Sequence, residues 1–413
     1  MRRKTRQIHV GNLAIGGDAP IVVQSMTTTY TRDIASTVAQ IHRLEDVGCE
    51  LVRVAVPEME DALAIGEIKR QINIPLVADI HYKHALALEA IRQGVDCVRV
   101  NPGNLINGRQ SLDEIVRACQ ERGNVAIRIG VNSGSIDALD QRGQMERIQV
   151  RRLADGTFEK SDPTEMRRRE RDKLAERMVN KALEYIGWCE ELDFREIKVS
   201  LKSSTPLTAV EAYRRFSERS DYPLHLGITE AGTVVTGAVK SAVGLGLLLS
   251  QGIGDTLRVS LSAEPEEEIP VAYEILRSLE LRNRGVTFVS CPSCGRVEID
   301  VVSVANEVEK RLAKVQTPIQ VAVMGCVVNG PGESRDADVV LAGGKGSGII
   351  FRKGQKVRTV PESEFLDAVL KEVASLLPPK EAQLVYPEGG IKETAGVHRT
   401  RDEGIGASLA ARQ

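Results

Sequence analysis

The sequence contains no uninterrupted apolar run of about 18 residues, which is the length that a membrane-spanning helix needs. Its basic residues 1–6 lead into the short segment 9–15 rather than into the apolar core of a secretory signal. With 42% hydrophobic residues and a formal net charge of −2, the chain has the composition of an ordinary soluble globular protein. We therefore expect a cytoplasmic protein that has neither a membrane nor a nucleic acid as a partner.

Cysteine is too sparse and too irregularly spaced for a disulfide framework. The chain has seven cysteines, an odd number, and four of them stand apart from one another in periodic segments. These four are Cys49, Cys97, Cys119 and Cys189. Isolated cysteines of this kind are typically buried free thiols, which persist in a reducing compartment.

A nucleotide-binding glycine motif is also absent. No Gly-x-Gly-x-x-Gly follows the first strand-like segment, which argues against the main alternative fold, a doubly wound open sheet. The first 262 residues contain a repeat instead, in which a helical pattern ends at a glycine and a strand with a central arginine follows. Eight β/α units in about 250 residues predict a TIM (β/α)8 barrel, which we assign to residues 1–284. The eight strand-like runs are centred on Arg53, Arg99, Arg128 and Arg258 or cover residues 22–27, 75–81, 196–203 and 223–230.

Strand alternation assigns the four arginines to the barrel lumen. Each is flanked by Val, Ile or Leu, which would pack against the outer helices, so the arginine lies on the opposite face. Unpaired cations in a low-dielectric interior are costly, and Asp79 alone is too little to neutralise them. A bound phosphate or diphosphate is the simplest partner for these cations. The other residues that alternation assigns to the lumen are Asp79, His81, Asn101, Asn132, Lys198, Ser200, Lys202, Ser260 and Ser262.

Residues 285–378 have the pattern of a smaller α+β domain. A helix is expected at 265–283, and the strand-like segments 286–289 and 319–324 then alternate with helical segments. Segment 343–348 is rich in glycine, but it lacks the spacing of a phosphate loop and is typical of a hairpin connection. Residues 379–413 have little apolar pattern, so we expect a mobile C-terminal tail.

Three cysteines and a glutamate in this second domain have the spacing of a reactive iron–sulfur site. Cys291 and Cys294 form a Cys-x-x-Cys pair, and Cys326 and Glu333 flank a Gly/Pro-rich turn. Three thiolates can hold three irons of a 4Fe-4S cluster, while a carboxylate is a harder and more exchangeable ligand for the fourth. The pair alone is equally typical of a structural zinc site or a redox dithiol. His398 is the only histidine after Cys291, so a fourth soft zinc ligand is hard to find.

Four motifs together carry a family resemblance. They are Cys291-Pro-Ser-Cys294-Gly-Arg, Met324-Gly-Cys326-Val-Val-Asn-Gly-Pro-Gly-Glu333, Val23-Gln-Ser-Met-Thr and Ile129-Gly-Val-Asn-Ser-Gly-Ser. The chain resembles the 4-hydroxy-3-methylbut-2-enyl diphosphate synthase family of the non-mevalonate isoprenoid pathway. The resemblance implies an iron–sulfur oxidoreductase with a 4Fe-4S cluster. Such an enzyme opens the ring of 2-C-methyl-D-erythritol 2,4-cyclodiphosphate, expels a hydroxyl as water and takes two electrons from ferredoxin or flavodoxin.

The same resemblance implies roles for individual residues. Cys291, Cys294, Cys326 and Glu333 would hold the cluster, and Glu230 would handle the proton. Alternation along residues 224–230 points Glu230 away from the lumen unless it has left the strand. The substrate-binding roles fall on Arg53, His81, Arg99, Arg128, Asn132, Lys202, Arg258 and Ser260.

Two other classes of function fit parts of the pattern. One is a different barrel enzyme for an anionic substrate, such as a pterin-type synthase, in which the cluster domain is structural. The other is an electron-transfer or iron-storage protein, which would have no need of four lumen arginines. A radical S-adenosylmethionine enzyme is excluded, because the chain has no Cys-x-x-x-Cys-x-x-Cys motif.

The length of the connection between the domains predicts a homodimer. A helix at 265–283 would carry the chain ~28 Å towards the bottom of the barrel, at ~1.5 Å per residue. Residues 284–290 span at most ~24 Å when fully extended, which is hardly enough to bring the cysteines back to the barrel mouth of the same chain. A two-fold, head-to-tail homodimer would place each cluster over the partner's barrel.

Overall fold

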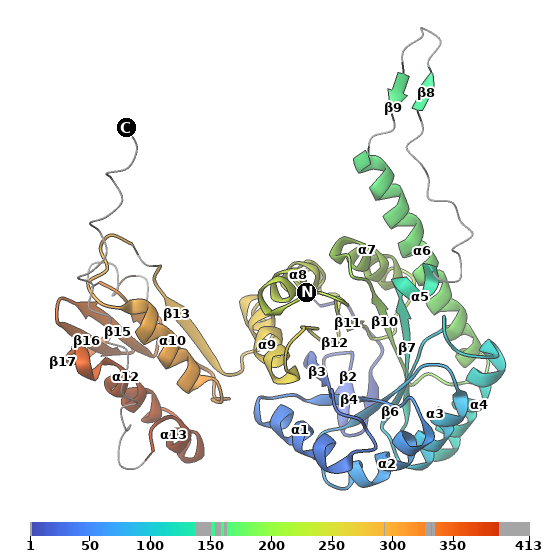
Figure 1. The fold of residues 1–413 in the computed structure, drawn as a ribbon, viewed down its shortest axis with the longest axis horizontal. Coiled ribbons are helices and arrows are strands. Elements are labelled where there is room, and N and C mark those ends of the chain that lie inside the picture. The colour runs from blue at the N-terminus through green and yellow to red at the C-terminus, as the bar shows by residue number, and fades with distance from the viewer. Residues whose placement is uncertain are drawn as a thin grey trace, which may run out of the picture. The chain divides into compact units, whose positions relative to one another are not determined.

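The computed structural model describes residues 2–137, 150–152, 158–160, 163–292, 294–326, 332 and 335–387. The chain divides into two compact units, Met1–Arg284 and Gly285–Gln413, which Figure 1 colours from blue to yellow and from orange to red. Each unit has its own sheet and its own apolar core. In the part of the chain that is described, no helix has both the length and the apolarity needed to cross a membrane.

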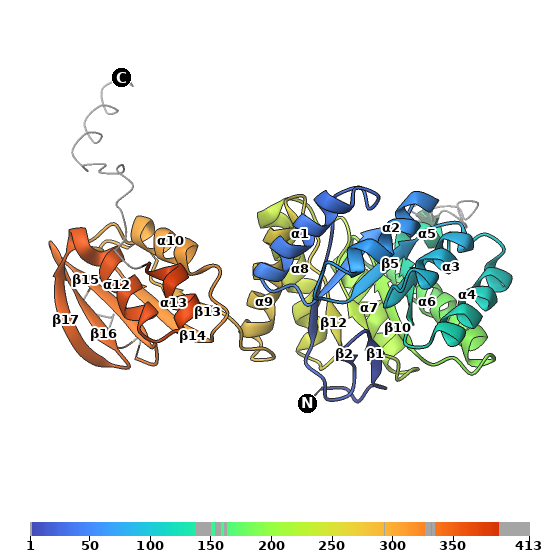
Figure 2. The same cartoon turned by 90° about the horizontal axis from the view of Figure 1, so that it is seen from below.

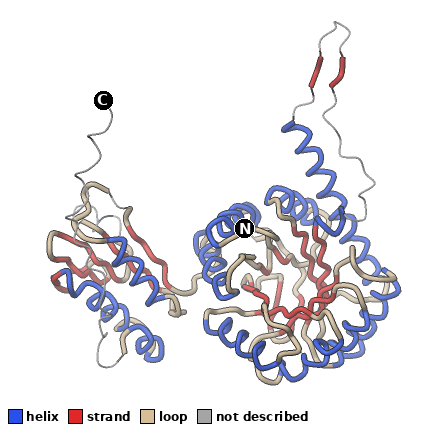
Figure 3. The backbone as a smooth tube through the Cα atoms, viewed as in Figure 1, coloured by secondary structure: helices blue, strands red, loops and turns tan. Residues whose placement is uncertain are grey.

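The first unit is the expected β/α barrel. Its eight strands are parallel and pair in the order β10-β7-β6-β5-β4-β3-β12-β11, and a bridge between Val199 and Leu224 joins the two ends of this order. Helices surround this ring of strands (Figure 3). The strands are β3 (Val22–Met26), β4 (Leu51–Ala55), β5 (Leu76–Ile80), β6 (Cys97–Val100), β7 (Ala126–Asn132), β10 (Ile197–Lys202), β11 (His225–Leu226) and β12 (Thr256–Leu257).

Local sequence accounts for the outer helices. The side chain of Asp33 caps α1 by accepting a hydrogen bond from Ser36 N at 3.1 Å, and the apolar stripe of α1 faces the core as its spacing predicts. The glycines at 48, 94, 123 and 252, which end helical segments in the repeat, all have positive φ, from 68° to 102°. The helices are α1 (Ile34–Asp46), α2 (Met59–Lys69), α3 (His84–Arg92), α4 (Gly108–Arg122), α5 (Ser133–Asp137), α6 (Pro163–Glu190), α7 (Pro206–Ser217), α8 (Val234–Leu249) and α9 (Glu268–Ser278).

A hairpin closes the lower end of the barrel. Strands β1 (Ile8–Val10) and β2 (Leu13–Ile15) pair with each other and lie at one end of the barrel in Figure 2. Their apolar side chains form a cluster with the lowest inward residues of the barrel, among them Val22, Leu51, Val77 and Cys97. The lumen is therefore sealed by apolar packing at the end opposite the carboxyl ends of the strands.

The helix predicted after the barrel differs from the structure. The helix expected at 265–283 is a 3-10 turn (Pro265–Glu267) followed by α9, which ends at Ser278. Eleven helical residues descend only ~17 Å, so more extended chain remains before Cys291 than the sequence estimate assumed. The length of the connection therefore does not by itself require a dimer. Within residues 141–162, which follow the fifth barrel strand and are rich in charge, the strands β8 (Val150–Arg152) and β9 (Phe158–Lys160) are described, and they pair as a hairpin.

The second unit is an α+β domain built on one sheet. Its five strands follow chain order, with β13 (Val286–Ser290), β14 (Ile319–Met324) and β15 (Val339–Gly344) parallel and β16 (Ser347–Arg352) and β17 (Gln355–Pro361) antiparallel. Helices α10 (Val301–Leu312) and α12 (Phe365–Ala374) contribute buried side chains to the core of this domain. The glycine-rich segment 343–348 is a hairpin connection, as predicted, since Gly344 pairs with Ser347.

The first residues of the expected tail are helical. Residues Pro379–Val385 form helix α13, although we expected the mobile tail to begin at residue 379. Val385 is buried in the core of the second unit, and the Tyr386 hydroxyl donates a hydrogen bond to Asp367 at 2.8 Å. These two contacts hold a segment whose own apolar pattern is weak. The rest of the expected tail, 388–413, lies outside the described residues.

Candidate active site

The strand registers stack the inward side chains of the barrel in layers, each with members from alternate strands. Counted from the sealed end, the first layer above Val22 and Ala126 holds Leu51, Cys97, Lys198 and Thr256. The second holds Gln24, Val77, Arg128 and His225. The third holds Arg53, Arg99, Ser200 and Arg258. The fourth holds Met26, Asp79, Gly130 and Gly227, and above it Lys202, Asn132, Ser260 and His81 lie at or near the barrel mouth.

Asp79 neutralises two of the lumen arginines. Its carboxylate lies 3.0 Å from Arg99 Nη1 and 3.7 Å from Arg53 Nε. Burial would raise the pKa of Asp79, but the charges of Arg53 and Arg99 outweigh that effect and hold the pKa well below its usual value. Asp79 is therefore ionised and serves as a fixed counter-ion in the middle of the lumen. His81, half exposed at the mouth, lies 3.6 Å from the same carboxylate.

Arg258 has a counter-ion that the sequence analysis missed. Glu268, at the start of α9, accepts hydrogen bonds from Arg258 Nη2 at 2.9 Å and Nε at 3.0 Å, and a third from the Ser25 hydroxyl at 2.8 Å. Its side chain is buried. We had assigned no site role to this glutamate, because an acidic run at the start of a helix is already favoured by the helix dipole. Its burial depends on a contact between distant segments, which local pattern does not reveal.

Cations still outnumber carboxylates in the described lumen. Six basic side chains face two acids, Asp79 and Glu268. Burial, followed by neighbouring positive charge, lowers the pKa of Lys202 well below its usual value and that of Arg128 to about 10. The lumen is thus poised to gain stability from a bound polyanion. The six are Arg53, Arg99, Arg128, Lys198, Lys202 and Arg258.

Two glycines make room for the long basic side chains. A Cβ at Gly130 would lie 2.4 Å from Arg99 Nε, and a Cβ at Gly227 would lie 2.7 Å from Lys202 Nζ. Any larger residue at either position would displace a cation. Arg53 Nη2 donates a hydrogen bond to the sulfur of Met26 at 2.8 Å, and a thioether sulfur is only a weak acceptor. Strong acceptors from a ligand would therefore find donors available.

Glu230 has left its strand. Strand β11 ends at Leu226, and Glu230 is an exposed residue of the following loop with φ of 53°, in the left-handed region that few non-glycine residues adopt. Strand alternation does not apply to such a residue. The loop follows the carboxyl end of β11, which is the end of a β/α barrel where active sites form. The position of Glu230 in this loop, and not strand parity, therefore puts it at the carboxyl-end face of the barrel.

The topology of the second unit brings the cysteines together. Cys291 directly follows β13 and Cys326 comes two residues after β14, and these strands are parallel neighbours with Ser290 opposite Val323. Gly325 N donates a hydrogen bond to Cys291 Sγ at 3.1 Å. Cys294 is exposed, and hydrogen bonds from the Arg296 backbone and side chain lower the pKa of its thiol. Glu333, the fourth predicted ligand, lies outside the described residues.

These thiols suit a cluster better than a single ion. Among the described residues, no three His, Cys, Asp or Glu side chains are close enough to hold one metal ion. A cluster does not need that, because each thiolate binds a different iron. The backbone amide of Gly325 that donates to Cys291 Sγ and the lowered pKa of the Cys294 thiol are both compatible with cysteines that bind iron as thiolates. The four isolated cysteines are buried free thiols, as predicted; they are Cys49, Cys97, Cys119 and Cys189.

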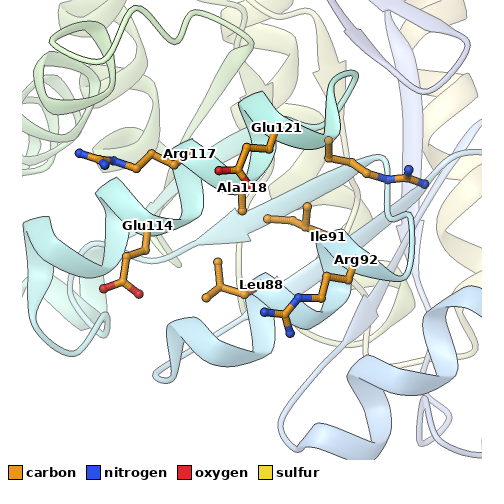
Figure 4. A pocket seen from close by; sticks show the side chains of 8 residues that line it. Leu88, Ile91, Arg92, Glu114, Arg117, Ala118 and Glu121 are labelled. Carbon is orange, nitrogen blue, oxygen red and sulfur yellow. The ribbon is translucent and has the colours of Figure 1, made fainter.

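An open groove of about 480 Å³ lies on the outside of the barrel between α3 and α4 (Figure 4). Its apolar wall includes Leu88, Ile91 and Ala118, and Arg92 and Glu121 also line it. The groove is separated from the lumen by the strand layer. It has no part in the site described above.

The fold and site define a β/α barrel with a cation-lined lumen, joined to a smaller domain whose loops after β13 and β14 carry three cysteines. Two family models match the chain, the GcpE TIM-barrel domain over residues 5–273 and the GcpE protein C-terminal domain over residues 287–375. The chain therefore belongs to the GcpE family.

Curated relatives cover nearly the whole chain. The 4-hydroxy-3-methylbut-2-en-1-yl diphosphate synthase (flavodoxin) of Geobacillus thermodenitrificans (strain NG80-2) is 50% identical over 396 residues, which are 95% of this chain and 98% of that protein. The protein of the same name from Bacillus cereus (strain G9842) is 51% identical over 374 residues, 90% of this chain and 93% of that protein. Among solved structures, dihydropteroate synthase from Stenotrophomonas maltophilia covers 67% of this chain and 97% of its own, with 13% identity and a TM-score of 0.45.

Proposed function

We propose that this protein converts 2-C-methyl-D-erythritol 2,4-cyclodiphosphate into 4-hydroxy-3-methylbut-2-enyl diphosphate by a two-electron reductive ring opening. The observation that carries the proposal is the excess of buried cations in the lumen, combined with three cysteines at one sheet edge of a second domain. The curated relatives that carry the synthase name match both units, which disfavours a pterin-type synthase with an accessory cluster.

The lumen residues bind and orient the cyclic diphosphate. Arg53, Arg128 and Lys202 supply positive charge that no described carboxylate fully neutralises, and charge-assisted hydrogen bonds to phosphate are the strong ones. Asn132 and Ser260 lie nearer the mouth and offer neutral donors. Asp79 and Glu268 fix the guanidinium planes of Arg99 and Arg258, so these two arginines meet the substrate already oriented.

Glu230 handles the proton in this proposal. Ring opening expels a hydroxyl group, which leaves as water only after it has gained a proton. Glu230 stands on the catalytic face, exposed and outside the strand, where its carboxyl group can reach a substrate held by the lumen cations. Its strained backbone is typical of a residue that a site holds in place for chemistry.

Cys291, Cys294 and Cys326 hold a 4Fe-4S cluster in this proposal, with Glu333 as the fourth protein ligand. When bound, the cluster supplies electrons one at a time beside the substrate, which no side chain can do. The electron donor is flavodoxin, the partner that the relatives carry in their name, and ferredoxin is the alternative. The free thiols are those of a cytoplasmic protein.

The decisive test is anaerobic. Purified protein should contain about four iron and four sulfide per chain and should form the product with reduced flavodoxin. Lys202→Ala should abolish turnover while leaving iron and sulfide unchanged. Full turnover after the cluster has been removed would refute the proposal and favour a structural cluster domain.

We further propose that the protein works as a head-to-tail homodimer. Large apolar side chains are exposed in the segments that follow the carboxyl ends of β3, β4, β5, β6 and β10, which surround the barrel mouth. These are Tyr30, Met59, Tyr82, Ile106 and Leu207. Exposed apolar groups that lie near one another are typical of a surface that is covered in the working protein. A cluster domain must reach this mouth, and the two-fold arrangement supplies it from the partner.

Subunit exchange tests this arrangement. Lys202→Ala lacks a working barrel and Cys326→Ala lacks a working cluster, so each homodimer is inactive. In a shared arrangement, every heterodimer contains one site with an intact barrel and an intact cluster, and activity returns. If mass spectrometry confirms exchange and no activity appears, each cluster serves the barrel of its own chain.

A further inference from the structure

The two lowest layers of the lumen contain several polar side chains, of which only Arg128 has a part in the proposed reaction. These layers comprise Leu51, Cys97, Lys198 and Thr256, and above them Gln24, Val77, Arg128 and His225. They lie beneath the layer of Arg53, Arg99 and Arg258. From below they are closed by the apolar side chains of the β1–β2 hairpin. These two layers form a buried region of the lumen, called the chamber below, which lies between the substrate site and the sealed end of the barrel.

Four side chains in this chamber have polar atoms without partners. Lys198 Nζ, Arg128 Nε and Nη1, His225 Nε2 and both amide atoms of Gln24 make no hydrogen bond to any described residue. None of the four side chains is more than 1% exposed. Buried polar groups are almost always hydrogen-bonded, and a buried charge without a partner is among the most costly features of a fold. Six such atoms in adjacent layers therefore indicate a bound group.

The chamber lacks negative charge. Neither layer contains a carboxylate, and the nearest acid, Asp79, is already paired with Arg99 and Arg53. Lys198 faces the Cys97 thiol of β6, Arg128 of β7 and Arg53 of β4, and His225 of β11 lies within their field. Burial lowers the pKa of Lys198 to about 8, and burial raises the pKa of the Cys97 thiol, which therefore stays protonated and cannot act as the counter-ion. The missing partner is an anion.

The donors also fit one small anion. The His225 ring is neutral, because burial lowers its pKa well below the usual value. Its Nδ1 lies 2.7 Å from the Thr256 hydroxyl, and when Nδ1 accepts that proton, Nε2 carries the ring hydrogen. Lys198, Arg128, His225 and the Gln24 amide then all donate. Leu51 and Val77 are the buried apolar members of the two layers.

We propose that a halide ion, chloride under physiological conditions, binds in this chamber between Lys198 and Arg128. The ion neutralises the lower lumen and accepts a hydrogen bond from Arg128 Nε, while the other nitrogens of the guanidinium are left for the substrate above. The site lies below the diphosphate site and shares Arg128 with it, but its occupancy does not depend on the proposed reaction.

Crystals of the full chain grown or soaked in bromide test the proposal directly. An anomalous peak within hydrogen-bonding distance of Lys198 Nζ and Arg128 Nε is the expected result. Density without anomalous signal at that position would show ordered water instead and would overturn the proposal.

Thermal unfolding in solution gives a second measurement. At matched ionic strength, sodium chloride or bromide should raise Tm by about 2–6 °C relative to sodium gluconate, because a ligand of the folded state stabilises it. Lys198→Met keeps the side-chain length and removes the charge, so this variant should fold and should lose the halide-specific shift. Lys240→Met, on the outer helix α8, is the matched control and should keep it.

The pH dependence of the shift follows from Lys198. Its amine is charged below a pKa of about 8 and neutral above it, so the halide-specific rise in Tm should be present at pH 7 and should shrink as the pH rises through 8. A halide shift that Lys198→Met retains in full, or none at all in the unmodified protein at pH 7, would overturn the proposal. Lys198→Gln serves as a second variant in case Lys198→Met does not fold. It keeps a neutral hydrogen-bond donor and should lose most of the halide-specific rise in Tm.

Discussion

Asp79→Asn is the most informative single substitution, because it removes the one carboxylate that two buried arginines share as their counter-ion. The amide has the same shape as the carboxylate, but Arg99 at 3.0 Å and Arg53 at 3.7 Å then face no counter-ion. Breaking a buried ion pair from one side costs about 3–5 kcal/mol. With a urea dependence of about 3 kcal/mol per molar, the midpoint of barrel unfolding should fall by about 1–1.7 M.

The assay can report on the barrel alone. Trp188 is the only tryptophan in the chain, and it lies in α6 beside Tyr185, at 4.6 Å between ring centroids. Its fluorescence therefore follows unfolding of the first unit. Asp221→Asn is the matched control, because Asp221 is exposed and pairs with Arg6 at 3.4 Å, so its loss should cost no more than about 1 kcal/mol. If Asp79→Asn lowers the urea midpoint no further than the control does, the ion pairs of Asp79 with Arg99 and Arg53 do not stabilise the barrel.

Asp79→Asn should also change how the stability of the protein depends on pH and on bound substrate. The pKa of Asp79 is depressed in the folded state, so its contribution to stability is present above its unfolded pKa of about 3.8 and is lost as the pH falls through the lower, folded value. Asp79→Asn should therefore unfold with a weaker acid dependence. Saturating substrate should stabilise the variant more than the unmodified protein, because the diphosphate replaces part of the missing negative charge.

Much of the barrel was predictable because its signals are local. A helix that ends at glycine before an arginine-centred strand recurs at residues 53, 99, 128 and 258, and the positive φ of each preceding glycine confirms why that residue is needed. Alternation then placed Lys198 and Lys202 on the inner face, where the structure has them. Alternation also predicts that His225 points into the lumen, because it lies between two outward leucines, although the sequence analysis assigned it no role.

The features that sequence reasoning missed depend on contacts between distant segments. Glu268 is buried because Arg258 and Ser25 meet it from other strands, and no pattern around residue 268 encodes that meeting. For Glu230, alternation pointed the side chain away from the lumen only if the strand continued through residues 227–230, and β11 ends at Leu226. Helix α13 was missed because a few tertiary contacts, and not an apolar stripe, hold it.

The remaining predictions concern substrate, cluster and proton. Arg53→Ala should weaken substrate binding about ten- to a hundredfold by calorimetry, at about 1.5–3 kcal/mol per charge-assisted bond, whereas His81→Ala should cost less because a neutral imidazole brings no full charge. Replacing any one cluster cysteine by alanine should lose most of the iron after anaerobic reconstitution, and a variant that keeps full iron removes that residue from the site; the three are Cys291, Cys294 and Cys326. Glu230→Gln keeps the size and the backbone strain of the loop residue but cannot donate a carboxylic proton. Since positioned general acids typically contribute about 10²–10⁴-fold, kcat should fall by about that factor while substrate affinity and iron content stay unchanged. An unchanged kcat would mean that the proton reaches the departing hydroxyl from another group, and the strained backbone at Glu230 would then need a structural explanation.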